Sequence, residues 1–307
     1  MLKLSVATSQ PENMRVKVYD GTKANTYYMN RSHIVKPGKP SSFYIRMPLS
    51  PDVSEIRIYN DKHGDLPKGK DPSFKLVDAA AMTLPRKIEG LQGMKPDVMD
   101  FVQLAEWFSK RAGWLSAATK DSPKSSYFSK TGNFRIDFYN ELKDENGKVL
   151  RTPARISITR GVIEVSAKHF RRYTVPQRLA ILFHEYSHFY ENKDAHDEIE
   201  ADLNGLLIYL GLGYPRIEAK NVFLDVFNKS PSDLNRKRDE ILEKFIDQFD
   251  SVNFDGTGSA PSAPNSSNNK PSGKIFGMRP IIGIPVMIGA IYGAWKLFEF
   301  LNKPKAV

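Results

Sequence analysis

The 307-residue chain contains no cysteine. This absence excludes disulfide bonds, thiolate metal sites and cysteine nucleophiles. It does not indicate a compartment, because a chain without cysteine suits any redox environment. Residues 1–5 also lack the apolar core of a secretory signal. We therefore expect no N-terminal signal peptide, so export would need another route.

The chain also lacks a nucleic-acid-binding motif, although its formal net charge is +10. A basic balance suggests a nucleic acid, an anionic membrane surface or a negatively charged assembly as a neighbour. The denser basic groups, residues 168–172 and 236–238, are short and have acidic residues nearby. We interpret them as solvated faces and helix ends, and we expect no specific nucleic-acid partner.

One stretch carries a chemical signature, the H-E-x-x-H pattern formed by His184, Glu185 and His188. Residues four apart on a helix share one face, so the two imidazoles can bind one metal ion. Glu185 lies close to the same place, where it can take a proton from a metal-bound water. The pattern therefore predicts a Zn²⁺ cofactor and the chemistry of a zinc peptidase.

The surroundings of this pattern argue against two surface histidines that are four apart by chance. Residues 174–177 form a capping box with Pro176 inside the first turn, and the apolar residues 179–183 follow. We expect this helix to be well started and largely buried. Buried histidines need polar partners, which a metal ion can provide.

A second helix, capped by Asp197, is expected to supply carboxylates. Glu198 and Asp202 are four apart, so they share a helix face. One can complete the metal site, and the other can accept the N–H of a ligand histidine and so fix its tautomer. An acidic helix start could instead simply complement the helix dipole. Two carboxylates on one face directly after the histidine pair favour the functional interpretation.

A short alternating strand, residues 161–166, precedes the metal helix. A strand in this place can lie along the cleft and pair with an extended substrate backbone. Ile163 and Val165 are therefore predicted to bind the substrate, a peptide or protein.

Residues from about 97 to 212 resemble the catalytic domain of gluzincin metallopeptidases, particularly the minimal kind, through the H-E-x-x-H helix and the later E-x-x-x-D pattern. The resemblance implies a backing helix, a small antiparallel sheet, the H-E-x-x-H helix and a glutamate helix. It further implies the following roles: zinc ligands His184, His188 and Glu198, general base Glu185, and histidine support from Asp202.

One departure from the family pattern concerns the third ligand. The interval between His188 and Glu198 is short compared with most gluzincins. Glu200, His196 and Asp202 are therefore alternatives to Glu198. A second donor to the oxyanion is also expected, and three residues are candidates for it: Tyr173, His196 and Tyr214.

The pattern of the whole chain predicts an α+β protein with four segments. Residues 1–90 read as a small β-sandwich-like module, with strands near 14–19, 42–47, 54–59 and 73–77. Residues 91–252 read as the zincin-like domain, with a helix at 97–112, strands near 134–139, 148–150, 155–159 and 162–166, and two packing helices near 216–228 and 232–250. Residues 253–274 are a Gly/Ser/Pro/Asn linker, and residues 275–307 carry a hydrophobic helix.

The last segment predicts an anchor. Residues 281–301 are mostly apolar and long enough to span a bilayer if Lys296 reaches the interface. Gly289 and Gly293 form a G-x-x-x-G pattern that permits helix–helix self-association. The alternatives are a tail that docks into a hydrophobic partner or lies on a membrane. We expect a membrane-anchored or virion-associated protein.

Two functions are therefore compared. The first is zinc-dependent peptide-bond hydrolysis by a tethered gluzincin-like metallopeptidase. The second is a structural or assembly protein of a virion or membrane complex, whose metal site is a fold staple or an accessory activity. The layout of the whole chain resembles proteins of phages and mobile elements of Bacteroidetes-type hosts. The two functions are compatible, for example in a virion-borne enzyme that cleaves cell-wall peptides.

Overall fold

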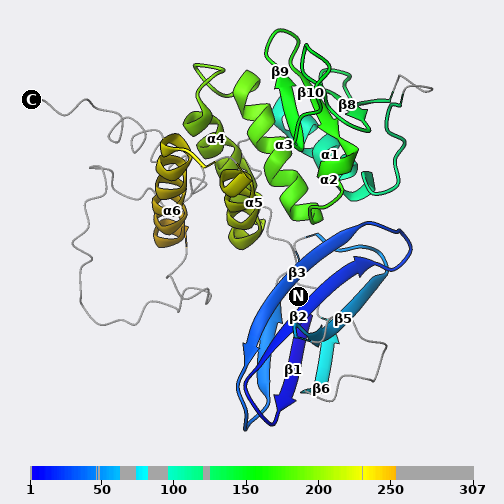
Figure 1. Cartoon of the computed structure of the whole chain (residues 1–307), viewed down its shortest axis with the longest axis vertical. Helices are drawn as coiled ribbons and strands as arrows, with labels where there is room; N and C mark the ends of the chain where they lie inside the picture. The colour runs from blue at the N-terminus through cyan, green and yellow to red at the C-terminus, as the bar shows by residue number, and fades with distance from the viewer. Residues whose placement is uncertain are drawn as a thin grey trace, which may run out of the picture.

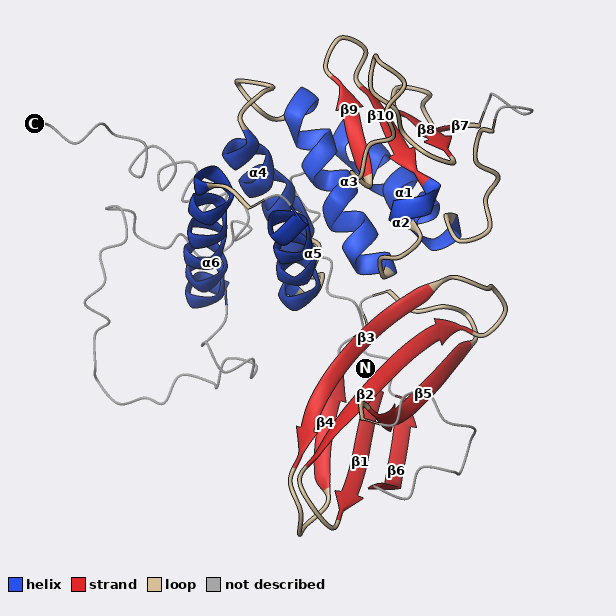
Figure 2. Ribbon diagram, in the orientation of Figure 1, coloured by secondary structure: helices blue, strands red, loops and turns tan. Residues whose placement is uncertain are grey.

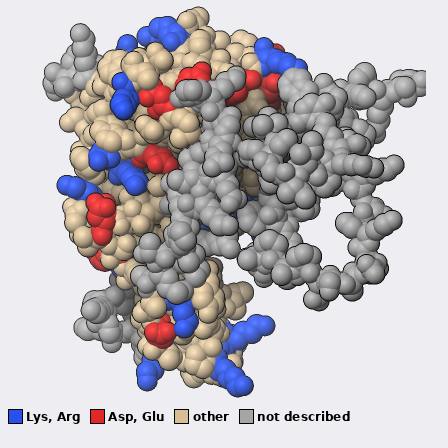
Figure 3. All heavy atoms as spheres, turned by 180° about the vertical axis from the view of Figure 1, so that it is seen from behind, with Lys and Arg blue, Asp and Glu red and all other residues tan. Residues whose placement is uncertain are grey.

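The computed structural model describes residues 2–45, 47, 49–62, 74–81, 96–119, 125–229 and 231–253. The described chain is α+β, as predicted, and consists of a β module followed by a domain of helices around a small sheet (Figure 1). On the face seen in Figure 3, Lys and Arg are interspersed with Asp and Glu.

The β module contains two three-stranded antiparallel sheets, ordered β4-β1-β6 and β3-β2-β5. Alternate residues of β1 and β2, such as Leu4 and Val16, are fully buried, which is the period-two pattern of a strand with one face on a core. The four predicted strands are present as β2, β4, β5 and β6. The sequence pattern did not predict β1 and β3. The strands are β1 (Leu2–Thr8), β2 (Glu12–Asp20), β3 (Tyr27–Val35), β4 (Ser41–Ile45), β5 (Ser54–Asn60) and β6 (Phe74–Ala81).

The second domain begins with the helix predicted at 97–112 and ends with four longer helices, of which the first is largely buried. Figure 2 shows α3 lying between the sheet on one side and α4 and α5 on the other. The elements are α1 (Pro96–Arg111), β7 (Ser126–Phe128), β8 (Arg135–Tyr139), β9 (Ala154–Ser157), β10 (Val162–Ser166), α2 (Ala167–Phe170), α3 (Val175–Tyr190), α4 (Glu198–Gly211), α5 (Arg216–Lys229) and α6 (Asp233–Asn253).

The sheet of this domain corrects the predicted strand arrangement. Its order is β7-β8-β10-β9, and β10 runs parallel to β8 and antiparallel to β9. Gly147 lies in a turn after β8, with φ of 80°. The strand predicted at 148–150 is reduced to an isolated bridge between Lys143 and Val149, and β10 inserts between β8 and β9. The sheet is therefore mixed rather than purely antiparallel.

The prediction that Ile163 and Val165 bind a substrate is consequently wrong. Both edges of β10 are already paired, and the two side chains are 1% and 0% exposed. The alternation of residues 161–166 suggested a strand with one solvated face, but all five residues of β10 are buried. The sheet edge on that side is β9.

Helix α3 is the central element and begins as predicted. The Gln177 N–H donates to Thr174 Oγ1 at 3.4 Å, and the Thr174 N–H donates to Gln177 Oε1 at 3.0 Å. These reciprocal bonds satisfy two donors that a helix start leaves without partners. Towards the other end of the helix, Tyr186 stacks on Phe101 of α1 with ring centroids 4.3 Å apart. The helix is thereby fixed at both ends.

Helix α4 approaches α3 very closely at Gly205. A Cβ atom at this position would lie 2.8 Å from the backbone N of His184 and 2.9 Å from its Cα. Only glycine fits such a contact between two backbones. The approach sets the distance between the start of α4 and the last turns of α3.

Within the part of the chain that the structure describes, no helix is long and apolar enough to cross a membrane. The predicted linker and the predicted anchor at 281–301, including Gly289 and Gly293, lie outside the described residues.

The contact at Gly205 generates a stability prediction. Alanine has a helix propensity about 1 kcal/mol better than that of glycine. We nevertheless expect Gly205→Ala to lower the free energy of unfolding by roughly 1–3 kcal/mol, because the new methyl group overpacks two backbones. Urea denaturation measures this difference. Gly132→Ala separates the two costs, because its φ of 82° imposes backbone strain while no atom lies within 4 Å of the added Cβ to be overpacked. A Gly205→Ala variant as stable as the parent would contradict the account.

Candidate metal centre

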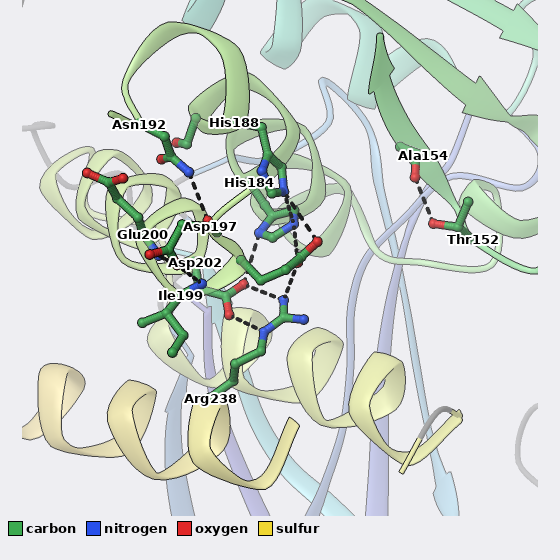
Figure 4. Close-up of polar contacts among 12 residues, drawn as sticks. Thr152, Ala154, His184, His188, Asn192, Asp197, Ile199, Glu200, Asp202 and Arg238 are labelled. Carbon is green, nitrogen blue, oxygen red and sulfur yellow. Dashed lines mark hydrogen bonds and ion pairs between the residues drawn. The ribbon is translucent and has the colours of Figure 1, made fainter. Parts of the chain in front are cut away.

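His184 and His188 lie on the last two turns of α3 and point to one place (Figure 4). Their Nε2 atoms are 3.1 Å apart. The side chains are 14% and 8% exposed. The helix therefore presents two nearly buried imidazoles side by side, as the four-residue spacing predicted.

Each imidazole has a partner at its other nitrogen. His188 Nδ1 lies 2.9 Å from the carbonyl oxygen of Ala195, which can only accept a hydrogen bond. His184 Nδ1 lies 2.9 Å from Asp202 Oδ1, although the ring is not aligned for a regular hydrogen bond. Both partners favour a proton on Nδ1, so both Nε2 atoms carry a lone pair.

This tautomer assignment makes the pair unfavourable without a cation. Two nitrogen lone pairs that face each other at 3.1 Å repel. A proton on one Nε2 would give a single hydrogen bond, whereas a metal ion would use both lone pairs at once. The arrangement is that of metal-ligating histidines, whose second nitrogen is held by a carbonyl or a carboxylate.

Glu198 supplies a third ligand atom from the first turn of α4. Its Oε2 lies 3.6 Å from His184 Nε2, and its Oε1 lies 3.8 Å from His188 Nε2. Ligands at 2.0–2.1 Å around a tetrahedral Zn²⁺ are about 3.3 Å apart. His184, His188 and Glu198 are also the one group of metal-ligand atoms that the described residues bring together. The predicted ligand set is therefore gathered closely enough that it could hold a metal ion, with one ligand atom from each residue within 4.8 Å of the others.

The competing third ligands lie elsewhere. Glu200 Oε2 accepts the backbone N–H of Lys193 at 3.0 Å, so this carboxylate holds the loop between α3 and α4. His196 is exposed in that loop. Asp202 faces His184 Nδ1, which leaves it beside the ligand rather than among the ligands.

The tyrosine candidates for an oxyanion donor are also engaged away from the histidines. The Tyr173 hydroxyl donates to Asp225 Oδ2 at 2.6 Å, and the Tyr214 hydroxyl donates to Glu106. Both side chains are buried.

Glu185 lies beside the ligand cluster and accepts a hydrogen bond from the backbone N–H of Ile156 in β9. Burial raises the pKa of Glu185 from 4.5 to about 7, and the charge of Glu198 adds to this effect. A carboxylate with this pKa can take up and release a proton near neutral pH. A bound cation would lower the pKa.

Arg238 of α6 completes the centre, and the sequence did not predict it. Its Nε and Nη2 donate to the two oxygens of Asp202 at 2.7 and 2.9 Å, and Nη2 also lies 3.0 Å from Glu198 Oε2. The side chain is buried, and Figure 4 shows its guanidinium pointing at Asp202. One guanidinium thus holds the predicted third ligand and the carboxylate that supports His184.

The position of Arg238 relative to apolar residues of the same helix could have indicated its role. The residue belongs to the basic group at 236–238, which suggested a solvated helix face. Yet Arg238 lies four and seven positions before the buried Leu242 and Phe245, on the same side of α6. A charged residue on an apolar helix face indicates a buried partner.

Burial and the neighbouring charges compete in setting the pKa values of the centre. Burial would raise the pKa of Asp202, but His184 and Arg238 outweigh it and lower that pKa. Burial would lower the pKa of His184, but Asp202 and the nearby carboxylates outweigh it and raise that pKa. Burial and His184 lower the pKa of His188.

Comparison of the chain with protein-family models, with curated proteins and with solved structures finds no match.

The raised pKa of Glu185 predicts how the metal-free protein responds to pH. The native state holds a proton on Glu185 up to about pH 7, whereas the unfolded chain releases it near 4.5. Native protein then binds more protons than unfolded protein between these values, so stability falls as pH rises through this window. Glu185→Gln should remove this penalty and stabilise the metal-free protein by roughly 2–3 kcal/mol above pH 7.

Urea denaturation in EDTA at pH 5 and pH 8 measures this effect. The gain from Glu185→Gln should be small at pH 5 and full at pH 8. Glu240→Gln, at an exposed position on α6, is the control and should change stability little at either pH. A gain that is the same at both values would show that the Glu185 carboxyl is not held protonated by its surroundings.

Proposed function

We propose that this protein is a zinc-dependent peptidase, with His184, His188 and Glu198 as metal ligands and Glu185 as general base. One observation carries the proposal: two oriented histidines and a carboxylate bring one ligand atom each within 4.8 Å of one another, with a second carboxylate beside them. Two imidazoles and one carboxylate are a common ligand set for catalytic zinc, and three protein ligands leave a fourth position for water or substrate.

A zinc ion bound there would make water nucleophilic at neutral pH and would polarise the scissile carbonyl. Glu185 takes the proton of the attacking water and later delivers it to the leaving nitrogen. The hydrogen bond from the Ile156 N–H aims the Glu185 carboxylate at one position, so a proton acceptor stands beside the ligand cluster before substrate arrives.

The side chains behind the ligands keep the site in this geometry. Asp202 and the Ala195 carbonyl hold the two imidazoles by Nδ1, and Arg238 holds both Asp202 and Glu198. A single rigid guanidinium with paired donors suits this task better than a flexible ammonium. Arg238 is therefore a positioning residue in the proposed mechanism.

The edge of β9 is the proposed contact for the substrate backbone. Ala154 and Ile156 are two apart, so their backbone groups face the same way, and the Ile156 N–H faces Glu185. The Ala154 carbonyl accepts the Thr152 hydroxyl at 2.7 Å across from the histidines (Figure 4). A peptide in extended form could add to this edge and bring its scissile bond to Glu185.

The alternative is a structural protein in which the metal is a fold staple. Structural zinc sites are usually closed by four protein ligands. Here the described residues offer three, and Glu198 is 41% exposed, so the site is open on one side. This openness favours an enzyme. Tethering to a membrane or particle through residues 281–301, and a cell-wall peptide as the substrate, remain part of the proposal.

Substitution of Glu185 tests the mechanism. We expect Glu185→Gln to bind zinc but to lose hydrolysis by about 10²–10⁴-fold, because the amide cannot accept the proton. Cleavage of a mixed-sequence peptide library and of peptidoglycan stem peptides, followed by mass spectrometry, measures the loss. Glu240→Gln should keep full activity.

Two outcomes would contradict the proposal. Full hydrolysis by a zinc-loaded Glu185→Gln variant would rule out the mechanism. A zinc-loaded parent protein that cleaves neither substrate class would support the structural role, and loss of folding on zinc removal would then identify the metal as a staple.

A further inference from the structure

A second site lies where the β module meets the helical domain. It is an open cleft of about 500 Å³, and none of the metal-centre residues lines it. The lining residues are Asn25, Tyr27, Asn140, Glu141, Ala167, Lys168, Arg171 and Arg172.

The lining of this cleft carries excess positive charge. Lys168, Arg171 and Arg172 oppose a single carboxylate, that of Glu141, which pairs with Lys168. Three cations against one anion leave two positive charges. Arg172 is exposed and makes no ion pair with a described residue.

Arg171 is held in place but not neutralised. Its Nε and Nη2 donate to the carbonyls of Ala112 and Leu115, both at 2.8 Å. These two bonds fix the guanidinium plane and leave Nη1 without a hydrogen-bond partner among the described residues. The residue is therefore a preoriented donor that lacks a carboxylate.

A second arginine without a carboxylate lies directly behind the wall of the cleft. Arg178 is 0% exposed, and its Nη2 donates to the carbonyls of Asn25 and Arg171, two of the lining residues. Its Nε and Nη1 donate to the carbonyls of Phe170 and Ser109. Carbonyl oxygens satisfy its hydrogen bonds but do not balance its charge.

The uncompensated charge has a cost that an anion would offset. Burial lowers the pKa of Arg178 to about 10, and it also lowers the pKa of Arg171. Two guanidinium groups thus stand together at the junction without a counter-charge among the described residues. An anion in the adjacent cleft would interact favourably with both, because charges near a low-dielectric interior are weakly screened.

We propose that this cleft binds a phosphate group, held by Arg172, Lys168 and the Nη1 of Arg171. A phosphate dianion matches the two excess charges of the lining. Its oxygens can accept several charge-assisted hydrogen bonds from guanidinium donors, which are the preferred partners of phosphate. The phosphate group can belong to inorganic phosphate or to a larger phosphorylated ligand such as an oligonucleotide.

Isothermal titration of the full chain with sodium phosphate, at constant ionic strength set with sodium chloride, tests this proposal. We expect saturable binding that Arg172→Gln weakens tenfold or more, since this removes a charge-assisted bond. Arg236→Gln, at a position where the side chain is 79% exposed on α6, is the matched control and should bind as the parent does. Circular dichroism checks that each variant folds.

A short oligodeoxythymidylate titrated under the same conditions distinguishes the source of the phosphate group. Binding of inorganic phosphate that is lost in Arg172→Gln supports a small-anion site. Binding of the oligonucleotide alone, lost in the same variant but kept in Arg236→Gln, supports a site for a phosphorylated polymer. Absence of both, or equal binding by the parent and Arg172→Gln, would overturn the proposal.

Discussion

The close approach of α4 to α3 at Gly205 is the constraint on which the metal centre depends. His184 belongs to the backbone that Gly205 touches, and Glu198 and Asp202 precede Gly205 on the same helix. Any separation of the two helices would carry both carboxylates away from the histidines. Arg238 then fastens the carboxylates to α6, so three helices share one set of ion pairs.

The same packing crowds charges together in a way that a bound cation would relieve. Three carboxylates, two imidazoles and one guanidinium lie close together, and Glu198 is the most exposed of the ion-paired groups at 41%. Burial disfavours the ionised form of Glu185 and so raises its pKa. Functional sites commonly keep such destabilising arrangements because a ligand resolves them. A divalent cation would do so here, since it would bind both lone pairs and attract all three carboxylates.

The sequence predicted the residues whose roles follow from helical spacing alone. His184 and His188 are four apart, as are Glu198 and Asp202, and both pairs share the predicted faces. Arg238 was missed because its partner, Asp202, lies 36 positions away in the chain.

The sequence also placed the sheet edge at residues 161–166. Alternating polar and apolar residues indicate a half-buried strand, but they do not indicate which strands lie beside it. Strand order depends on how β10 inserts between β8 and β9, which no local pattern encodes. The cleft that we propose as a phosphate site also joins residues that are far apart in the chain, from the β2–β3 turn and from α2. The basic group at 168–172 therefore suggested only a solvated face.

The zinc content of the full chain, purified without chelator, tests the central claim most directly. The account predicts about one zinc per chain, lost in His184→Ala and in Glu198→Ala, because each variant leaves two ligands. His196→Ala, in the exposed loop beside the centre, should keep its zinc. A parent protein that binds no zinc, or a Glu198→Ala variant that retains it while His196→Ala does not, would contradict the three-ligand centre.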